Sequence, residues 1–152
     1  MEIVLYQPEI PSNTGNIART CAVTGSPLHL IEPLGYSLED RYLKRAGLDY
    51  WDQLDIRIWK DWDSFMEVHG KGRFWYLTTK GTVSYGQVDF GPSDYLVFGP
   101  ETRGLPGELL EEHPESTCRI PMGDKFRSLN LSNAVAIVLY EALRQNHYPG
   151  LR

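Results

Sequence analysis

At residues 95–106 the chain reads Tyr95-Leu96-Val97-Phe98-Gly99-Pro100-Glu101-Thr102-Arg103-Gly104-Leu105-Pro106. The unbroken apolar run at its start predicts a β-strand covered on both faces, because a strand with one wet face alternates apolar and polar residues. The glycines and prolines that follow predict a rigid, irregular turn, and Pro106 suits the first turn of a helix. The stretch therefore predicts a buried strand, a fixed turn and a helix in direct succession.

The same succession recurs along the chain. Apolar runs typical of strands are Ile3–Tyr6, Leu28–Ile31, Ile56–Trp59, Phe74–Thr78, Tyr95–Gly99 and Cys118–Pro121. Helices are predicted from the N-cap types Asn13-Thr14 to Gly25, and over 37–47, 61–68, 106–113 and 132–146. This alternation predicts an α/β fold with a single, mainly parallel sheet flanked by helices, in one domain over residues 1–152.

The composition argues against several classes of protein. Lys and Arg number 15 against 20 Asp and Glu, so the formal net charge of −5 disfavours a surface coated in positive charge, although a local basic patch stays possible. The longest apolar run, 134–140, is far shorter than the about 20 residues of a membrane span. The amino terminus lacks a signal-peptide pattern and the two cysteines lie far apart, so a cytoplasmic location without membrane contact is expected.

Several common chemical motifs are absent. The chain has no G-x-x-x-x-G-K-[ST] loop and no G-x-G-x-x-G after its first strand, which disfavours a flavodoxin-like or dinucleotide-binding protein. It has no G-x-S-x-G for a serine hydrolase. Its histidines and cysteines show no metal-ligand spacing, so no metal is expected.

Polar clusters follow three of the predicted strands, at 8–19, 98–106 and 120–134. Each has a structural explanation: Asn13 as an N-cap, a Glu101–Arg103 pair that holds its loop, and Ser and Asn residues that cap the last helix. In open α/β sheets, however, ligands bind outside the carboxyl ends of the strands. Capping alone does not explain why three strands of one sheet end in such segments.

Taken together and in order, the clusters resemble the three motifs of the SPOUT class (SpoU/TrmH-like) of RNA methyltransferases. The motifs are N-T-G-N-I-A-R at 13–19, F-G-P-E-T-R-G-L at 98–105, and I-P-M at 120–122 followed by S-L-N-L-S-N-A at 128–134. Within the class the chain is most similar to the minimal TrmL (YibK-like) group, which lacks an N-terminal RNA-binding extension. Supporting segments are 6–11, 44–50 and 77–81.

The resemblance implies a C-terminal deep trefoil knot, a structure that general topology rules make rare. It also implies a tRNA partner and a homodimer formed through the last helix. That helix is apolar nearly all round from Ala134 to Leu143 apart from Glu141, a pattern typical either of a central core helix or of one that also packs on a second subunit.

The resemblance further implies S-adenosylmethionine as cofactor and 2′-O-methylation of the wobble nucleotide 34 (C or modified U) of leucine tRNAs. The implied catalytic residues are Arg19, held by Asn16 and Glu101, and Tyr140 near the target nucleotide. The implied cofactor-binding residues are Leu77, Gly99, Ile120, Met122 and Ser128.

For RNA contacts, the basic cluster Arg41, Lys44 and Arg45 and the motif neighbour Arg127 are the candidates, with a solvated helix face as the alternative. Two other functions stay open from the sequence. One is methylation of a different tRNA position or of rRNA, and the other is a non-catalytic RNA- or nucleotide-binding module of the same fold.

Overall fold

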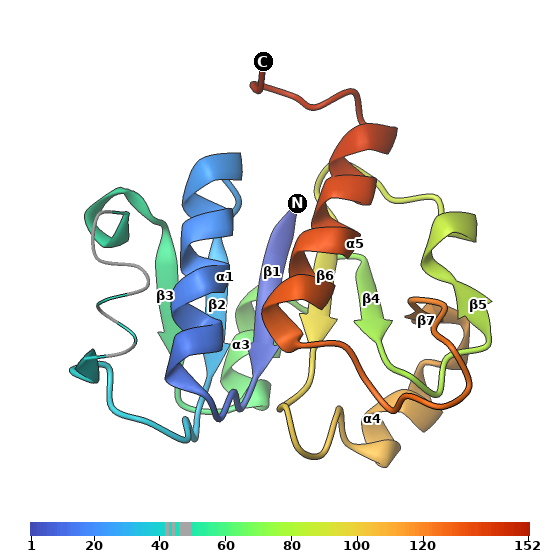
Figure 1. Cartoon of the computed structure of the whole chain (residues 1–152), viewed down its shortest axis with the longest axis horizontal. Coiled ribbons are helices and arrows are strands. Elements are labelled where there is room, and N and C mark those ends of the chain that lie inside the picture. Colours follow the sequence, from blue (N-terminus) through green and yellow to red (C-terminus); the bar gives the residue numbers. More distant parts are fainter. Residues whose placement is uncertain (42, 44, 46–49) are drawn as a thin grey trace.

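The computed structural model describes residues 1–41, 43, 45 and 50–152 of the chain. Its centre is a seven-stranded sheet in the order β3-β2-β1-β6-β4-β7-β5, in which every neighbouring pair is parallel (Figure 1). The strands are β1 Glu2–Tyr6, β2 Leu28–Ile31, β3 Ile56–Trp59, β4 Phe74–Leu77, β5 Val83–Ser84, β6 Tyr95–Phe98 and β7 Thr117–Arg119. The predicted α/β class is confirmed, with a sheet that is wholly rather than mainly parallel.

The central strands are buried on both faces, as their sequence predicts. All of β6 is buried, and β1 beside it pairs Val4 with Val97. One face of the sheet is covered by α1, Pro11–Thr24, and α5, Leu131–Gln145, which lie side by side in Figure 1. The other face packs on α3, Trp62–His69, through a cluster of aromatic side chains.

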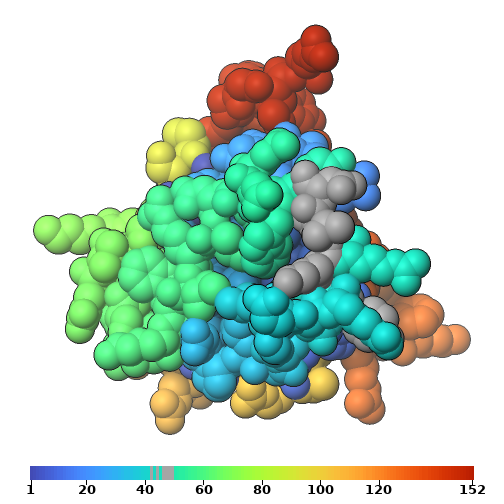
Figure 2. All heavy atoms as spheres, turned by 90° about the vertical axis from the view of Figure 1, so that its left-hand side faces the viewer, coloured from blue at the N-terminus to red at the C-terminus, as the bar shows by residue number. Residues whose placement is uncertain are grey.

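Shorter elements complete the chain. These are α4, Gly107–Glu112, and the 3-10 turns η1 Trp51–Gln53, η2 Tyr85–Gln87 and η3 Pro114–Ser116. Seen from the β3 edge, the surface consists largely of residues 51–69 together with the segment around 33–41 (Figure 2). Among the described residues, no helix combines the length and the apolar character that a membrane crossing needs.

Helix boundaries differ from the sequence predictions for local reasons. The first helix begins at Pro11, whose ring favours an opening turn, so Asn13 is not the N-cap but a buried residue of that turn. Asn130 caps α5, since its Oδ1 accepts from the backbone N–H of Ser132 at 2.9 Å. The fourth helix starts at Gly107, directly after Pro106. The predicted helix over 37–47 lies partly outside the described residues.

The last helix has one buried side and an apolar exposed side. It buries Val135, Val138 and Leu139 against the sheet and α1, whereas Ile137 and Tyr140 remain 38% and 42% exposed. A helix that covers only the sheet carries polar residues on its outer face. Ile137 and Tyr140 therefore form an exposed apolar surface on which a further element could pack.

The strand β5 is not predicted from the sequence. The position of β5 in the sheet makes the chain cross over β7. Although β5 follows β4 directly in sequence, β7 lies between them. Segment 78–82 crosses β7 so closely that a Cβ at Gly81 would lie 2.8 Å from the carbonyl carbon of Cys118. Crossed connections are rare in open sheets, and a knotted chain requires them. The trefoil knot itself stays an implication of the family resemblance.

Candidate functional site

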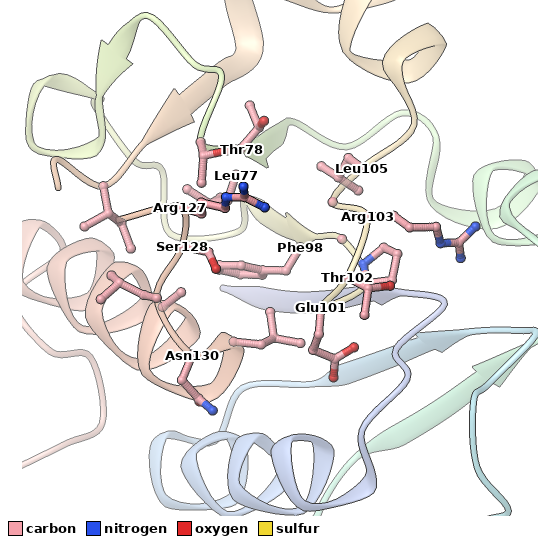
Figure 3. A pocket seen from close by; sticks show the side chains of 18 of the residues that line it. Leu77, Thr78, Phe98, Glu101, Thr102, Arg103, Leu105, Arg127, Ser128 and Asn130 are labelled. Atoms are coloured by element: carbon pink, nitrogen blue, oxygen red, sulfur yellow. The ribbon is translucent and has the colours of Figure 1, made fainter. Parts of the chain in front are cut away.

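A cavity of about 580 Å³ lies outside the carboxyl ends of β4, β6 and β7, within the size range of small-molecule sites (Figure 3). Its wall is formed by residues 77–80, 98–105, 110, 120, 122, 127–131 and 134, together with Ile10 and Asn13 at the start of α1. All the residues expected to bind a cofactor line it: Leu77, Gly99, Ile120, Met122 and Ser128. The structure thus brings together residues that are up to 51 positions apart in sequence, between Leu77 and Ser128.

The loop after β6 folds tightly back on itself. A Cβ at Gly99 would lie 2.3 Å from the backbone nitrogen of Leu105, so only glycine fits there. The turn is closed by a hydrogen bond from the Gly104 N–H to the Pro100 carbonyl at 2.9 Å, and Gly104 has a φ of 68°. This turn gives the cavity a fixed wall of main-chain atoms.

Glu101 joins this loop to the start of α1. Its carboxylate accepts hydrogen bonds from the N–H groups of Glu9 at 2.8 Å and Ile10 at 3.1 Å, and from Asn13 Nδ2 at 3.3 Å. In return, Glu9 accepts from the N–H and the hydroxyl of Thr102, which lowers the pKa of the Glu9 carboxyl. Since Ile10 provides no side-chain cap, Glu101 serves as the acidic group at this helix end.

The sequence offers an ion pair between Glu101 and Arg103 as the structural explanation of this loop. Both residues are among those that the structure describes, and the structure does not contain that pair. Arg103 instead donates to Gln7 Oε1 at 3.3 Å, and its side chain points away from the cavity in Figure 3. The arrangement holds the loop against the end of β1.

Two asparagines connect all three polar clusters, and the sequence prediction did not find this role. Asn130 Nδ2 donates to Asn13 Oδ1 at 3.0 Å, while Asn13 donates to Glu101. Asn13 is 5% exposed, so a missing partner would leave a buried amide unsatisfied. The only sequence signal was that both residues lie within the motifs, each next to a predicted helix start.

The other expected catalytic residues lie outside the cavity wall. Asn16 and Arg19 are exposed on α1, and Arg19 has its guanidinium carbon 5.0 Å from the centre of the Tyr50 ring. Tyr140 is exposed on α5. Of the expected catalytic set, the structure places Glu101 alone at the cavity, where its hydrogen bonds are to residues 9, 10 and 13. That it also holds Arg19 stays a prediction.

The candidate RNA contacts fall into two groups. Arg41 and Arg45 are exposed, and Lys44 lies outside the described residues. Arg127, by contrast, lines the cavity, and Figure 3 shows its guanidinium between Thr78 and Phe98. Among these candidates that the structure describes, Arg127 lines the cavity, whereas Arg41 and Arg45 do not.

The cysteines are structural. Burial raises the pKa of both Cys21 and Cys118 to about 12, which leaves two neutral thiols unsuited to nucleophilic attack. Among the part of the chain that the structure describes, no three His, Cys, Asp or Glu residues are grouped to hold a metal ion.

Comparisons with known proteins show the family of the chain. Residues 1–140 match the family described as SpoU rRNA Methylase. The chain is 52% identical over 151 residues to the tRNA (cytidine(34)-2'-O)-methyltransferase of Escherichia coli K12, covering 99% of this chain and 96% of that protein.

Solved structures show the same fold. One, described as "Structural insights into the 2-OH methylation of C/U34 on tRNA", has a TM-score of 0.92 at 50% identity and covers 96% of this chain and 95% of that one. An AdoMet-bound rRNA methyltransferase from Sinorhizobium meliloti has a TM-score of 0.84 at 26% identity and covers 94% of this chain and 55% of that one.

Proposed function

Since the chain belongs to the SpoU methylase family, we propose that it is a tRNA methyltransferase that transfers the methyl group of S-adenosylmethionine to the ribose 2′-hydroxyl of nucleotide 34. The observation that carries the proposal is the cavity of about 580 Å³ built from the three motif segments. The nucleotide position rests on the relatives at about 50% identity, whose names and descriptions specify position 34.

The cavity fits the cofactor. Leu77, Ile120 and Met122 supply apolar surface for an adenine ring, and the fixed 99–104 turn supplies main-chain donors and acceptors. S-adenosylmethionine supplies a methyl carbon made electrophilic by its sulfonium. The protein has to hold the ribose hydroxyl in line with that carbon.

With the cofactor bound, the transfer would break its bond from sulfur to the methyl carbon, form a bond from O2′ to that carbon, and release the hydroxyl proton to solvent water. Arg19 is a poor base because the pKa of a guanidinium exceeds about 12. We assign it the role of a cation that binds the neighbouring phosphate and stabilises charge that develops on O2′. Asn16 lies on the same helix face, and Tyr50 packs against the Arg19 guanidinium.

The active form in this proposal is a cytoplasmic homodimer in which residues 1–152 act as one methyltransferase domain. The exposed Ile137 and Tyr140 on α5 support packing of a second copy on that helix, because they extend the apolar surface beyond the sheet contact. Tyr140 then lies at the interface beside the bound RNA. The trefoil knot expected of the family accounts for the crossing of segment 78–82 over β7.

A second candidate substrate is rRNA, which the description of the Sinorhizobium meliloti neighbour names. The lower identity of 26% and the coverage of 55% of that chain favour the tRNA assignment.

The test is incubation with total tRNA and methyl-labelled S-adenosylmethionine, followed by mapping of the labelled nucleotide. We expect label at nucleotide 34 of leucine tRNAs. A matched substrate with 2′-deoxyribose at position 34 should accept no label. Label on another nucleotide or on rRNA alone would contradict the assignment.

A further inference from the structure

Three cationic side chains line the cofactor cavity: Lys80, Arg103 and Arg127. Arg103 is bonded to Gln7 and points outward. Lys80 lies at the rim, where the cavity adjoins a smaller hollow of about 320 Å³ that Arg103 shares. Arg127 differs from both, because its guanidinium projects into the space between the loops, near Thr78 and Phe98 (Figure 3).

Within the described residues, the Arg127 guanidinium has no hydrogen-bond or ion-pair partner. Among the residues that line the cavity, Glu101 is the acidic one. Glu101 already accepts from Glu9, Ile10 and Asn13 at the start of α1. The cavity thus presents an exposed positive charge that is available to a ligand.

The charges of the cofactor decide which part of it meets this guanidinium. S-adenosylmethionine carries two positive groups, a sulfonium and an α-ammonium, and one negative group, the α-carboxylate. A guanidinium repels the first two and attracts the third, and at short range in a partly enclosed site these energies are larger than in water. Its planar fork also matches a carboxylate with two parallel hydrogen bonds.

We propose that Arg127 binds the α-carboxylate of the cofactor, and so fixes the methionine end of the molecule rather than the RNA. The proposal rests on the proposed function, which supplies the cofactor. It replaces the RNA contact expected for Arg127 from the sequence and leaves the exposed cations, such as Arg45, for the RNA.

The test compares two ligands, of which only one carries the amino-acid end with its carboxylate. S-adenosylhomocysteine carries the whole amino-acid end, whereas 5′-methylthioadenosine keeps the adenosine and the thioether alone. Calorimetric titration of Arg127→Gln should show about 10- to 100-fold weaker binding of S-adenosylhomocysteine and unchanged binding of 5′-methylthioadenosine. Arg127→Lys, which keeps the positive charge but not the planar guanidinium, should weaken the binding of S-adenosylhomocysteine by a smaller factor.

Lys125→Gln is the matched control, since it removes one positive charge from the same loop at a residue that does not line the cavity. It should leave both affinities unchanged.

Equal weakening of the binding of both ligands by Arg127→Gln would overturn the proposal, because it would mean that the loop packing had been lost. An unchanged affinity for S-adenosylhomocysteine with a raised KM for tRNA would also overturn it and return Arg127 to the RNA. Failure of the wild-type protein to bind either ligand would instead contradict the cofactor assignment itself.

Discussion

The two ends of the parallel sheet both gather polar side chains, but they use them differently. At the carboxyl end, the motif loops surround a cavity whose cations are exposed. Near the amino end, His29 is fully buried. Its Nε2 lies 2.5 Å from Glu2 Oε2, and its Nδ1 accepts a hydrogen bond from Trp59 Nε1 at 3.1 Å. His69 packs on it with ring centroids 4.9 Å apart and bonds to the Tyr95 hydroxyl.

The difference indicates which of the two polar clusters is the better candidate for a ligand site. The histidine cluster is packed against Trp59, Phe65 and Tyr95, so its polar groups hold β1, β2, β3, β6 and α3 together. At the cavity, the side chains that do bond to one another, such as Glu101 and Asn13, hold loops, while Arg127 points into open space. A polar group without an internal partner at the carboxyl edge is therefore the better indicator of a ligand.

The largest expected effect comes from Arg19→Ala in the first motif. Loss of the cation that stabilises charge on O2′ should lower kcat about 100- to 1000-fold in a labelled-methyl assay with tRNA. The melting temperature should stay near that of the wild type, because Arg19 is exposed. The control is Arg57→Ala near the amino end, which breaks the exposed pair with Asp55 and should leave kcat unchanged. Activity close to wild type in a folded Arg19→Ala protein would remove Arg19 from the mechanism.

Glu101→Gln tests whether the carboxylate at the cavity is mainly a loop connector. The substitution leaves an amide that accepts more weakly from Glu9, Ile10 and Asn13, so we expect a loss of about 2 kcal/mol in the free energy of unfolding. Urea denaturation measures it. Glu108→Gln, an exposed change on α4, should cost almost nothing. A stable Glu101→Gln protein with abolished methyl transfer would show that the carboxylate acts in catalysis instead.

The histidine cluster should respond to pH. Burial lowers the pKa of His29, so the unfolded chain, with its His pKa near 6.5, binds the proton more readily than the folded one. Stability is therefore complete above about pH 6.5 and falls as the pH decreases from there toward the lowered value. We expect the free energy of unfolding to decrease over this pH range, measured by urea denaturation at fixed ionic strength.

The pH effect can be assigned with one variant. His29→Gln removes the group and should flatten this part of the stability profile, at a lower overall stability because Glu2 and Trp59 lose a partner. An equally steep profile in this variant would mean that another group titrates there.

Local sequence patterns predicted most of the strands and helices, whereas contacts between residues far apart in sequence determine the arrangement of the candidate site. Apolar runs located six of the seven strands, whereas Val83–Ser84 is too short to form such a run. The role of Asn13 could not be predicted, because its partner Asn130 is 117 residues away and its own position resembled a helix cap. Similarly, Glu101 finds its donors 88 to 92 residues earlier. The family resemblance, not periodicity, selected the residues that line the cavity.

The smallest expected effect concerns RNA affinity, and it tests whether this chain of net charge −5 confines its RNA contacts to particular basic residues. A cation that contacts one phosphate releases about 0.7 to 0.9 counterion, so Arg45→Gln should reduce the slope of log K for tRNA against log salt by about that amount. Lys71→Gln, between α3 and the amino end of β4, removes the same charge from a different segment of the chain. It should leave the slope unchanged, because an acidic protein that binds RNA has to confine its basic residues to one surface. Equal slopes for the two variants would show that Arg45 is only a solvated side chain of its segment.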